Sequence, residues 1–169
     1  MKFRCERDAL VEALGAAGRA VANRGGALPV LAGVRAELTR NRLRFTGSDL
    51  ELTIEVEIEV AGEADGVAVL PSKIASDLVR SLGEPRVEVV VDGDEAQITA
   101  GRFTSSLRLL PADEFPRLSM PGDDAVTLAA PDFAAALHQV VPAASSDDAR
   151  PILTGVLLAA EEGGLRLVA

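Results

Sequence analysis

The sequence predicts an α+β protein in which two amphipathic helices cover one side of a largely antiparallel sheet. Residues 1–110 read as a strand, a helix and three strands, and this order occurs twice. The helical segments have apolar residues at the spacing of one helix face, whereas the strand segments alternate apolar and polar residues. This order of elements favours a layer of helices packed on a layer of antiparallel strands.

The first copy begins with a strand candidate at residues 2–5 and a helix over residues 7–22. The helix is predicted from a stripe of apolar residues on one face, namely Leu10, Leu14, Ala17 and Val21. Residues 24–26 (RGG) end it, and strands are predicted at residues 29–38, 43–46 and 50–60. The last strand, LELTIEVEIEV, alternates apolar and acidic residues, which is typical of a strand with one face in water.

The second copy follows a polar turn at residues 61–66. A strand at residues 67–70 leads into a helix at residues 72–82, which Pro71 opens and for which Ser72 is the expected N-cap. Residues 83–85 (GEP) end this helix. Three strands then follow at residues 86–91, 96–100 and 103–110, separated by turns at residues 92–94 (DGD) and 101–102 (GR).

A connector is predicted at residues 111–125, because this stretch contains three prolines, a glycine and four acidic residues. After it, residues 126–141 (VTLAAPDFAAALHQVV) repeat the opening strand and helix. One face of this helix is apolar and consists of Phe133, Ala136, Leu137 and Val140.

A longer repeat relates residues 29–46 to residues 151–168 at an offset of 122, with six identities in eighteen positions. The identical pairs are Pro29/Pro151, Leu31/Leu153, Gly33/Gly155, Val34/Val156, Leu43/Leu165 and Arg44/Arg166. We interpret it as a tandem repeat of whole domains, with a complete domain at residues 1–122 and the first part of a second at residues 123–169. Coincidence between two β-rich segments is the alternative. The second copy holds only its first strand, helix and two strands, so we expect a fragment of a longer protein or, alternatively, a natural short paralogue.

Composition excludes several classes of protein. Hydrophobic residues make up 48% of the 169 residues, with five Phe and no Trp or Tyr, so the core must be aliphatic. A single cysteine cannot form an internal disulfide, and no secretory leader or membrane-spanning run is recognisable, so we expect a cytoplasmic protein without a membrane partner. The net charge of −9 argues against tight binding of many phosphates but permits a local basic surface.

Catalytic and metal-binding chemistry find little support. The only histidine, His138, and the only cysteine, Cys5, cannot supply a zinc site, which normally uses three or four ligands. Gly15 and Gly18 lie inside a predicted helix and are not followed by the residues of a phosphate loop. We therefore expect a non-enzymatic protein without a cofactor or metal.

Several segments together resemble one family. They are MKF at residues 1–3, LPVLAGV at 28–34, TGSDLELTIEV at 46–56, LPSKIASDLVRSLG at 70–83 and LRLLPADEFPRL at 107–118. The chain is similar in register to the beta subunit of bacterial DNA polymerase III, the sliding clamp family. The resemblance implies a DNA-clamp fold of three domains per full-length chain. It also implies a head-to-tail homodimeric ring that encircles duplex DNA, with helices lining the hole, and tethers the replicative polymerase as a processivity factor. A truncated paralogue that acts as a protein-interaction module is the alternative.

DNA-facing positions are expected on and near the helices. Lys73 and Arg80 are seven residues apart and share a helix face, opposite Ile74 and Leu78. The expected set is completed by Arg7 and Arg19 on the first helix and by Arg24 in the loop after it, which matches a family position associated with DNA contact. A solvated surface charge is the alternative at each position. Two groups of acidic side chains depart from the pattern: Asp8 and Glu12 share the face of Arg19, and Asp147-Asp148 lie where a polar DNA-facing loop is expected.

Two protein-binding sites are implied as well. Short peptide motifs of the polymerase and of clamp-loader subunits would bind a groove whose near wall matches Arg150, Ile152, Leu153 and Thr154 in this chain. The alternative is that Ile152 and Leu153 are strand core. Ring closure would use the second helix and a neighbouring edge strand, at Leu78, Leu82, Ser105 and Leu107.

Overall fold

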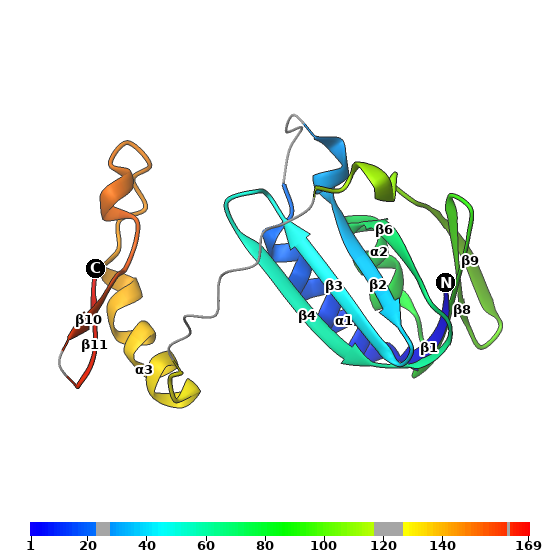
Figure 1. The fold of residues 1–169 in the computed structure, drawn as a ribbon, viewed down its shortest axis with the longest axis horizontal. Coiled ribbons are helices and arrows are strands. Elements are labelled where there is room, and N and C mark those ends of the chain that lie inside the picture. The colour runs from blue at the N-terminus through cyan, green and yellow to red at the C-terminus, as the bar shows by residue number, and fades with distance from the viewer. Residues whose placement is uncertain (23–27, 117–126, 162) are drawn as a thin grey trace. The chain divides into compact units, whose positions relative to one another are not determined.

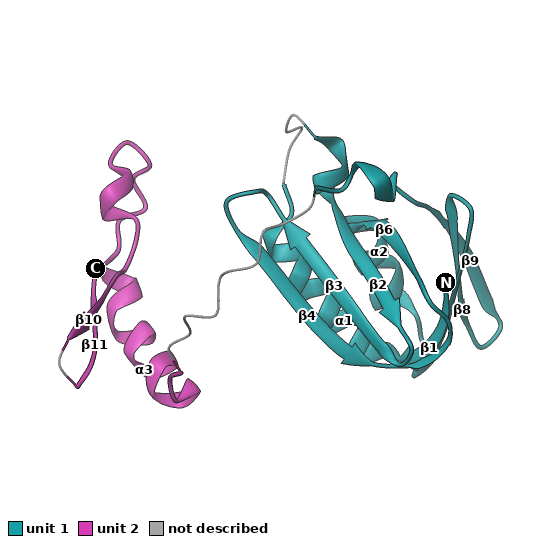
Figure 2. Cartoon of the chain, in the orientation of Figure 1, with its two compact units in different colours: residues 1–119 teal, residues 120–169 magenta. Residues whose placement is uncertain are grey.

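The computed structural model describes residues 1–22, 28–116, 127–161 and 163–169. The chain forms two compact units, unit 1 at residues 1–119 and unit 2 at residues 120–169 (Figure 2). The predicted domain boundary between residues 122 and 123 lies outside the described residues and stays a prediction.

Unit 1 contains two antiparallel sheets, where the sequence predicted one. Sheet A has the strand order β5-β1-β7-β8-β9 and sheet B the order β4-β3-β2-β6 (Figure 1). The strands of sheet A are β1 (Lys2–Glu6), β5 (Ala61–Ala64), β7 (Arg86–Asp92), β8 (Glu95–Ala100) and β9 (Phe103–Arg108). Those of sheet B are β2 (Gly33–Thr39), β3 (Arg42–Ser48), β4 (Thr53–Glu59) and β6 (Gly66–Pro71). A single bridge between Val69 and Leu110 joins β6 to the segment after β9.

Both helices lie on the same side of sheet B, behind its strands in Figure 1. Helix α1 (Arg7–Ala17) packs against β3, β4 and α2, and helix α2 (Ser72–Ser81) packs against β2 and β6. Close approach requires a glycine at position 47, since a Cβ there would lie 1.9 Å from the carbonyl oxygen of Ala17. This arrangement confirms the predicted α+β class with two helices on one face.

The core of unit 1 is aliphatic, as the composition predicts. It is formed by side chains from α1, α2 and both sheets, and its largest fully buried members are Phe45, Leu14, Leu38, Leu43 and Ile98. Burial of a leucine side chain of this kind contributes roughly 1.5–3 kcal/mol. A smaller cluster is formed by Val30, Leu31, Val69 and Phe115.

Several predicted elements of unit 1 need correction. The first helix ends at Ala17 and continues only as a 3-10 turn (Gly18–Ala20), and residues Pro29–Ala32 form a second 3-10 turn instead of a strand. The polar turn predicted at residues 61–66 contains β5, because this segment pairs with β1. Ser72 is not an N-cap: it is the first residue of α2, Pro71 holds the cap position, and no side chain caps the helix.

Unit 2 contains helix α3 (Ala130–Val140) and the hairpin β10 (Leu157–Glu161) and β11 (Gly164–Val168). In this hairpin Leu158 pairs with Leu167, just as Ala36 pairs with Phe45 in β2–β3. Every pair of the two hairpins is related by the offset of 122, so the repeated segments form equivalent hairpins, and the interpretation as a repeat of whole domains stays a prediction. The strand expected before α3 is not formed at residues 127–129. In unit 1 the corresponding strand β1 pairs with β5 and β7, and the described part of unit 2 contains no equivalent of β5 or β7.

Candidate nucleic-acid interface

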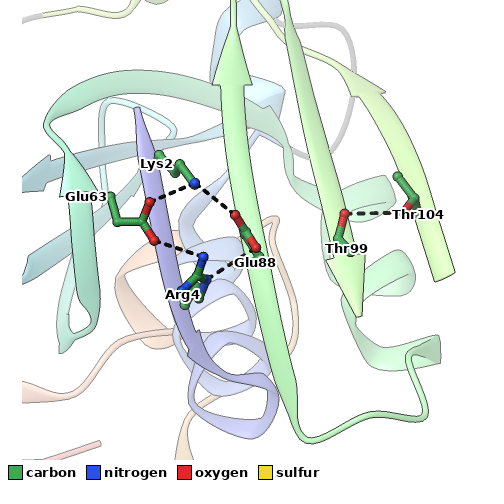
Figure 3. Close-up of polar contacts among 6 residues, drawn as sticks. All are labelled: Lys2, Arg4, Glu63, Glu88, Thr99 and Thr104. Atoms are coloured by element: carbon green, nitrogen blue, oxygen red, sulfur yellow. Dashed lines mark hydrogen bonds and ion pairs between the residues drawn. The ribbon is translucent and has the colours of Figure 1, made fainter. Parts of the chain in front are cut away.

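The outer face of sheet A carries cations that neighbouring carboxylates neutralise (Figure 3). Lys2 Nζ lies 2.7 Å from Glu63 and 3.2 Å from Glu88, and Arg4 lies 3.1 Å from Glu63 and 3.2 Å from Glu88. Hydrogen bonds to Glu63 and Glu88 raise the pKa of Lys2, and those from Arg4 and Lys2 lower the pKa of Glu88. Lys2 and Glu88 are therefore charged near neutral pH, and each cation of the network lies beside two carboxylates.

Sheet B shows the same compensation on its polar face. Arg35 lies 2.6 Å from Glu37, and Glu57 lies within 3.7 Å of Arg42 and 3.4 Å of Arg44. A phosphate that approached either sheet would have to displace a carboxylate already paired with the cation. The two sheets are therefore poor surfaces for nucleic acid.

The helix side differs, because it carries cations without carboxylate partners. Lys73 on α2 and Arg19 in the turn after α1 are exposed and form no ion pair within the described part of the chain. Arg80 shares the outward face of α2 with Lys73 and lies 3.5 Å from Asp77. This face has two acidic neighbours on α1, since Asp8 and Glu12 are exposed as well.

The buried side of α2 was only partly predicted. Ser72, Ala75 and Val79 are its buried residues. Of the two apolar residues expected opposite the cations, Leu78 is half-buried and packs on the core, whereas Ile74 is 59% exposed.

Arg7 has a structural role in this fold. Its guanidinium donates hydrogen bonds to the carboxylate of Asp8 and, at 2.7 Å, to the carbonyl oxygen of Leu82. Its backbone N–H also bonds to the carbonyl oxygen of Pro85 at 2.7 Å. Arg7 thus joins the start of α1 to the end of α2, and its contact with DNA stays a prediction. Arg24 lies outside the described residues.

The predicted groove residues of unit 2 lie in a 3-10 turn (Pro151–Leu153) and at its borders. Ile152 is 90% exposed, Leu153 is exposed as well, and both lie in the 3-10 turn and not in a strand, while the role of the two residues in a groove stays a prediction. Arg150 forms an ion pair with Asp147 at 3.0 Å, so the carboxylate of Asp147 is compensated by a neighbouring cation. The hydroxyl of Thr154 donates to the carbonyl oxygen of Pro151 at 2.8 Å.

The predicted ring-closure residues differ in accessibility. Leu82 and Leu107 are buried members of the main core, whereas Leu78 and Ser105 are half-buried. Strand β9, which carries Ser105, is an edge of sheet A. Sequence reasoning missed two exposed apolar side chains on the same elements, Ile74 of α2 and Phe103 of β9. The alternation of Phe103, Ser105 and Leu107 along one strand face could have indicated the second of them.

The described part of the chain shows few of the side-chain arrangements used in catalytic or metal-binding sites. No group of three or more His, Cys, Asp or Glu residues there could hold a metal ion. Burial raises the pKa of the Cys5 thiol to about 12, so this side chain is neither a nucleophile nor a ready ligand. His138 is exposed on α3. None of the described helices is long and apolar enough to cross a membrane.

Two helices backed by antiparallel sheets, with Lys73 and Arg19 left without a carboxylate partner among the described residues of the helix side, are the arrangement expected of a DNA-clamp domain. Residues 1–119 match the family model described as DNA polymerase III beta subunit, N-terminal domain. The chain belongs to this family.

Relatives and solved structures agree with this assignment. The chain is 34% identical to the beta sliding clamp of Streptomyces coelicolor over 99% of its length, and 35% identical to that of Micrococcus luteus over 92%. It is similar to the DNA polymerase sliding clamp of Bacillus subtilis, with a TM-score of 0.88 at 32% identity over 99% of this chain and 46% of that chain. The chain spans 44% and 50% of the two curated relatives, so about half of their length.

Proposed function

We propose that this chain belongs to a DNA polymerase processivity factor that acts in the cytoplasm without catalysing a reaction itself. In a chain extended to the length of its relatives, two copies would close head to tail into a ring around duplex DNA. The ring would tether the replicative polymerase. Relatives named beta sliding clamp that match 92–99% of the chain support this proposal.

The observation that carries the proposal is the contrast between the two faces of unit 1. The sheets carry paired charges, whereas Lys73 and Arg19 on the helix side have no carboxylate partner among the described residues. A net charge of −9 argues against a protein that holds DNA by neutralising many phosphates. A few cations on the inner side of a ring would centre the duplex, and encirclement would retain it.

The contribution of the helix side can be tested on the present chain with Lys73→Gln. Loss of one phosphate contact should lower the slope of log K against log salt by about 0.9 and weaken binding to a short duplex by several-fold. Arg44→Gln is the matched control, since Glu57 already compensates Arg44 at 3.4 Å, and should leave the affinity within about twofold. Titration by fluorescence anisotropy at low salt measures both. Equal losses in the two variants would contradict a DNA-facing helix layer.

Encirclement itself requires the longer chain. Loaded on nicked circular DNA, it should stay bound at a salt concentration that removes it from the same DNA after linearisation. The ring would close through α2 and the edge strand β9, where Leu78, Ser105 and the exposed Ile74 and Phe103 provide contact surface supported by Leu82 and Leu107. Equal retention on circular and linear DNA would refute the ring.

Peptide binding would use Arg150, Ile152, Leu153 and Thr154 as one wall of a groove. Exposed Ile152 and Leu153 support this, because an apolar pair at the surface is what a hydrophobic peptide anchor needs. We expect the present chain to bind polymerase and clamp-loader peptides weakly or not at all; a titration with an affinity equal to that of the longer chain would contradict this.

The second candidate function is a protein-interaction module without DNA encirclement. It is favoured by the similarity to a protein named beta sliding clamp homolog GriR from Streptomyces muensis, 31% identical over 92% of the chain. The two functions differ in the DNA experiments, since a pure interaction module should show neither the Lys73 effect nor topological retention.

A further inference from the structure

Unit 1 contains a groove beside β6, the edge strand of sheet B. The groove has a volume of about 690 Å³ and lies between β6, the first turn of α2, the turn that joins β7 to β8, and the end of β9 with the residues that follow it. Its lining includes Val67, Ile74, Asp94, Arg108, Leu109 and Leu110. We call this surface the β6 groove.

The walls of the β6 groove are mainly apolar. Val67 is 40% exposed and Ile74 is 59% exposed, while Leu109 and Leu110 are half-buried. Ligand sites are typically concave, lined mostly by apolar side chains and about 300–1,000 Å³ in volume. The β6 groove therefore has the size and the lining of a binding site.

The strand edge in this groove offers unpaired backbone groups. Strand β6 pairs with β2 on one side, and its other side is held by one bridge, in which the N–H of Leu110 donates to the carbonyl oxygen of Val69 at 2.9 Å. Alternate residues of a strand point their N–H and C=O groups to the same edge, so those of Val67 point to the same side as those of Val69. No described strand pairs with Val67 on that side. An extended peptide could add to the sheet there.

The charges at the β6 groove favour an acidic occupant. Arg108 lies 3.6 Å from Asp94, and both side chains are at least 75% exposed, so the pair is weak and Arg108 can accept another carboxylate. Helix α2 begins beside the groove without a side-chain cap and without an acidic residue in its first turn. Its N-terminal end is therefore an uncompensated positive pole, to which the exposed Lys73 adds a charge.

We propose that the β6 groove is a second peptide-binding site, which takes an extended segment with alternating aliphatic side chains and a carboxylate. The backbone of the segment pairs with Val67, its aliphatic side chains contact Leu109 and Leu110, and its carboxylate lies beside Arg108. This site lies entirely within unit 1. It goes beyond the proposed function, because it requires neither a ring, nor DNA, nor the groove at Arg150–Thr154.

A peptide suits the groove better than a small anion. A free anion would use Arg108 and the start of α2 but would leave the apolar walls and the backbone groups of Val67 without a partner. An aliphatic compound without charge would leave Arg108 unused. An extended acidic-apolar segment uses all three features at once.

Three labelled peptides test the proposal on the 169-residue chain. The probe is the fluorescein-labelled, C-terminally amidated hexapeptide LTVTVE, and its counterparts LTVTVQ and LTVTVK differ in the last side chain only. We expect LTVTVE to bind about fivefold more tightly than LTVTVK, with LTVTVQ between them, because the exposed Arg108 attracts one charge and repels the other. Fluorescence anisotropy at low salt measures the three affinities.

A matched pair of variants identifies the cation. Arg108→Glu should reverse the preference, so that LTVTVK binds more tightly than LTVTVE. Arg86→Glu is the control, since Arg86 is also 85% exposed and in one ion pair, with Glu6, but does not line the β6 groove. This variant should keep the preference of the parent. Circular dichroism verifies that both variants are folded.

Hydrogen exchange locates the bound peptide. Saturation with LTVTVE should slow exchange of the Val67 amide by about tenfold, because this N–H gains a partner on the free edge. The amide of Ala68, which points toward β2, should exchange as before and serves as the internal reference.

Four outcomes would overturn the proposal. The first is no binding of any of the three peptides up to millimolar concentration. The second is an unchanged preference in Arg108→Glu, and the third is slowed exchange in residues 150–154 without an effect at Val67, which would place the peptide in the other groove. The fourth is slowed exchange at Val67 that rises with the concentration of the chain alone, which would identify a second copy as the occupant. None of these experiments uses DNA or the longer chain, so failure here and failure of the proposed function are distinguishable.

Discussion

The hairpins β2–β3 of unit 1 and β10–β11 of unit 2 pair residue for residue in the same register, yet they differ in what covers them. Ala36 is fully buried, whereas its counterpart Leu158 is 50% exposed. Val30 is 1% exposed and its counterpart Ile152 is 90% exposed. Similar sequence and identical pairing thus produce a core in one unit and a surface in the other. Register is a property of the hairpin itself, but burial depends on neighbours that are distant in the chain.

The largest effect expected from this difference is on the free energy of unfolding. Leu43→Ala should reduce it by about 2–5 kcal/mol, because Leu43 is fully buried and its removal leaves a cavity. Its counterpart Leu165→Ala, at a half-buried position, should change the same transition by less than about 1 kcal/mol. Urea denaturation followed by circular dichroism measures both. Equal losses would show that the two units unfold as one.

The reactivity of the Cys5 thiol measures whether the core of unit 1 unfolds independently of unit 2. Burial raises the pKa of Cys5 from 9.0 to about 12, so the reactive thiolate should be about 1000-fold scarcer at pH 8 than in a solvated thiol. We expect alkylation to follow unfolding of unit 1 and to be insensitive to Leu165→Ala. Fast labelling in the native chain would place Cys5 in a part of unit 1 that opens locally.

The smallest effect concerns the network of ion pairs on sheet A, whereas the β10–β11 hairpin of unit 2 has the exposed pair of Arg166 and Glu161. Arg4 and Lys2 lower the pKa of Glu88, so its contribution to stability is present above the unfolded pKa near 4.5 and is lost as the pH falls through the lower folded value. Glu88→Gln should therefore be slightly less stable than the parent at pH 7 and equal to it once the pH is well below 4.5. Thermal unfolding across pH 3–7 measures this, with Glu95→Gln, which forms no ion pair among the described residues, as the control. A difference that persists at the lowest pH would exclude ionisation of Glu88 as its cause.

Local patterns predicted much of the fold. The stripe of Leu10, Leu14 and Ala17 placed the buried face of α1 correctly, and the alternation in residues 50–60 predicted β4. Features that depend on distant partners were missed. Strand β5 was read as a turn because Gly62 and Asp65 are turn-like residues, and only pairing with β1 makes the segment a strand. The division into two sheets also depends on pairings between strands far apart in sequence.

The candidate site shows the same limit. Spacing placed Lys73 and Arg80 on one outward face of α2, and both are exposed there. It could not show that Arg7 bonds to Leu82, 75 residues away. Nor could it show that Arg4 and Lys2 share Glu63 and Glu88, since each carboxylate comes from a different strand. The distances between side chains on neighbouring strands therefore decide which cations are free to contact a phosphate.

By itself the sequence determined the repeat, the class of fold and the family, because each follows from the order and pattern of residues along the chain. The tertiary structure decided which of the repeated apolar positions are buried and which of the basic side chains lack a partner. Burial and charge compensation arise from contacts between strands and helices that chain folding brings together. Two segments with the same local pattern are therefore buried in unit 1 and exposed in the described part of unit 2.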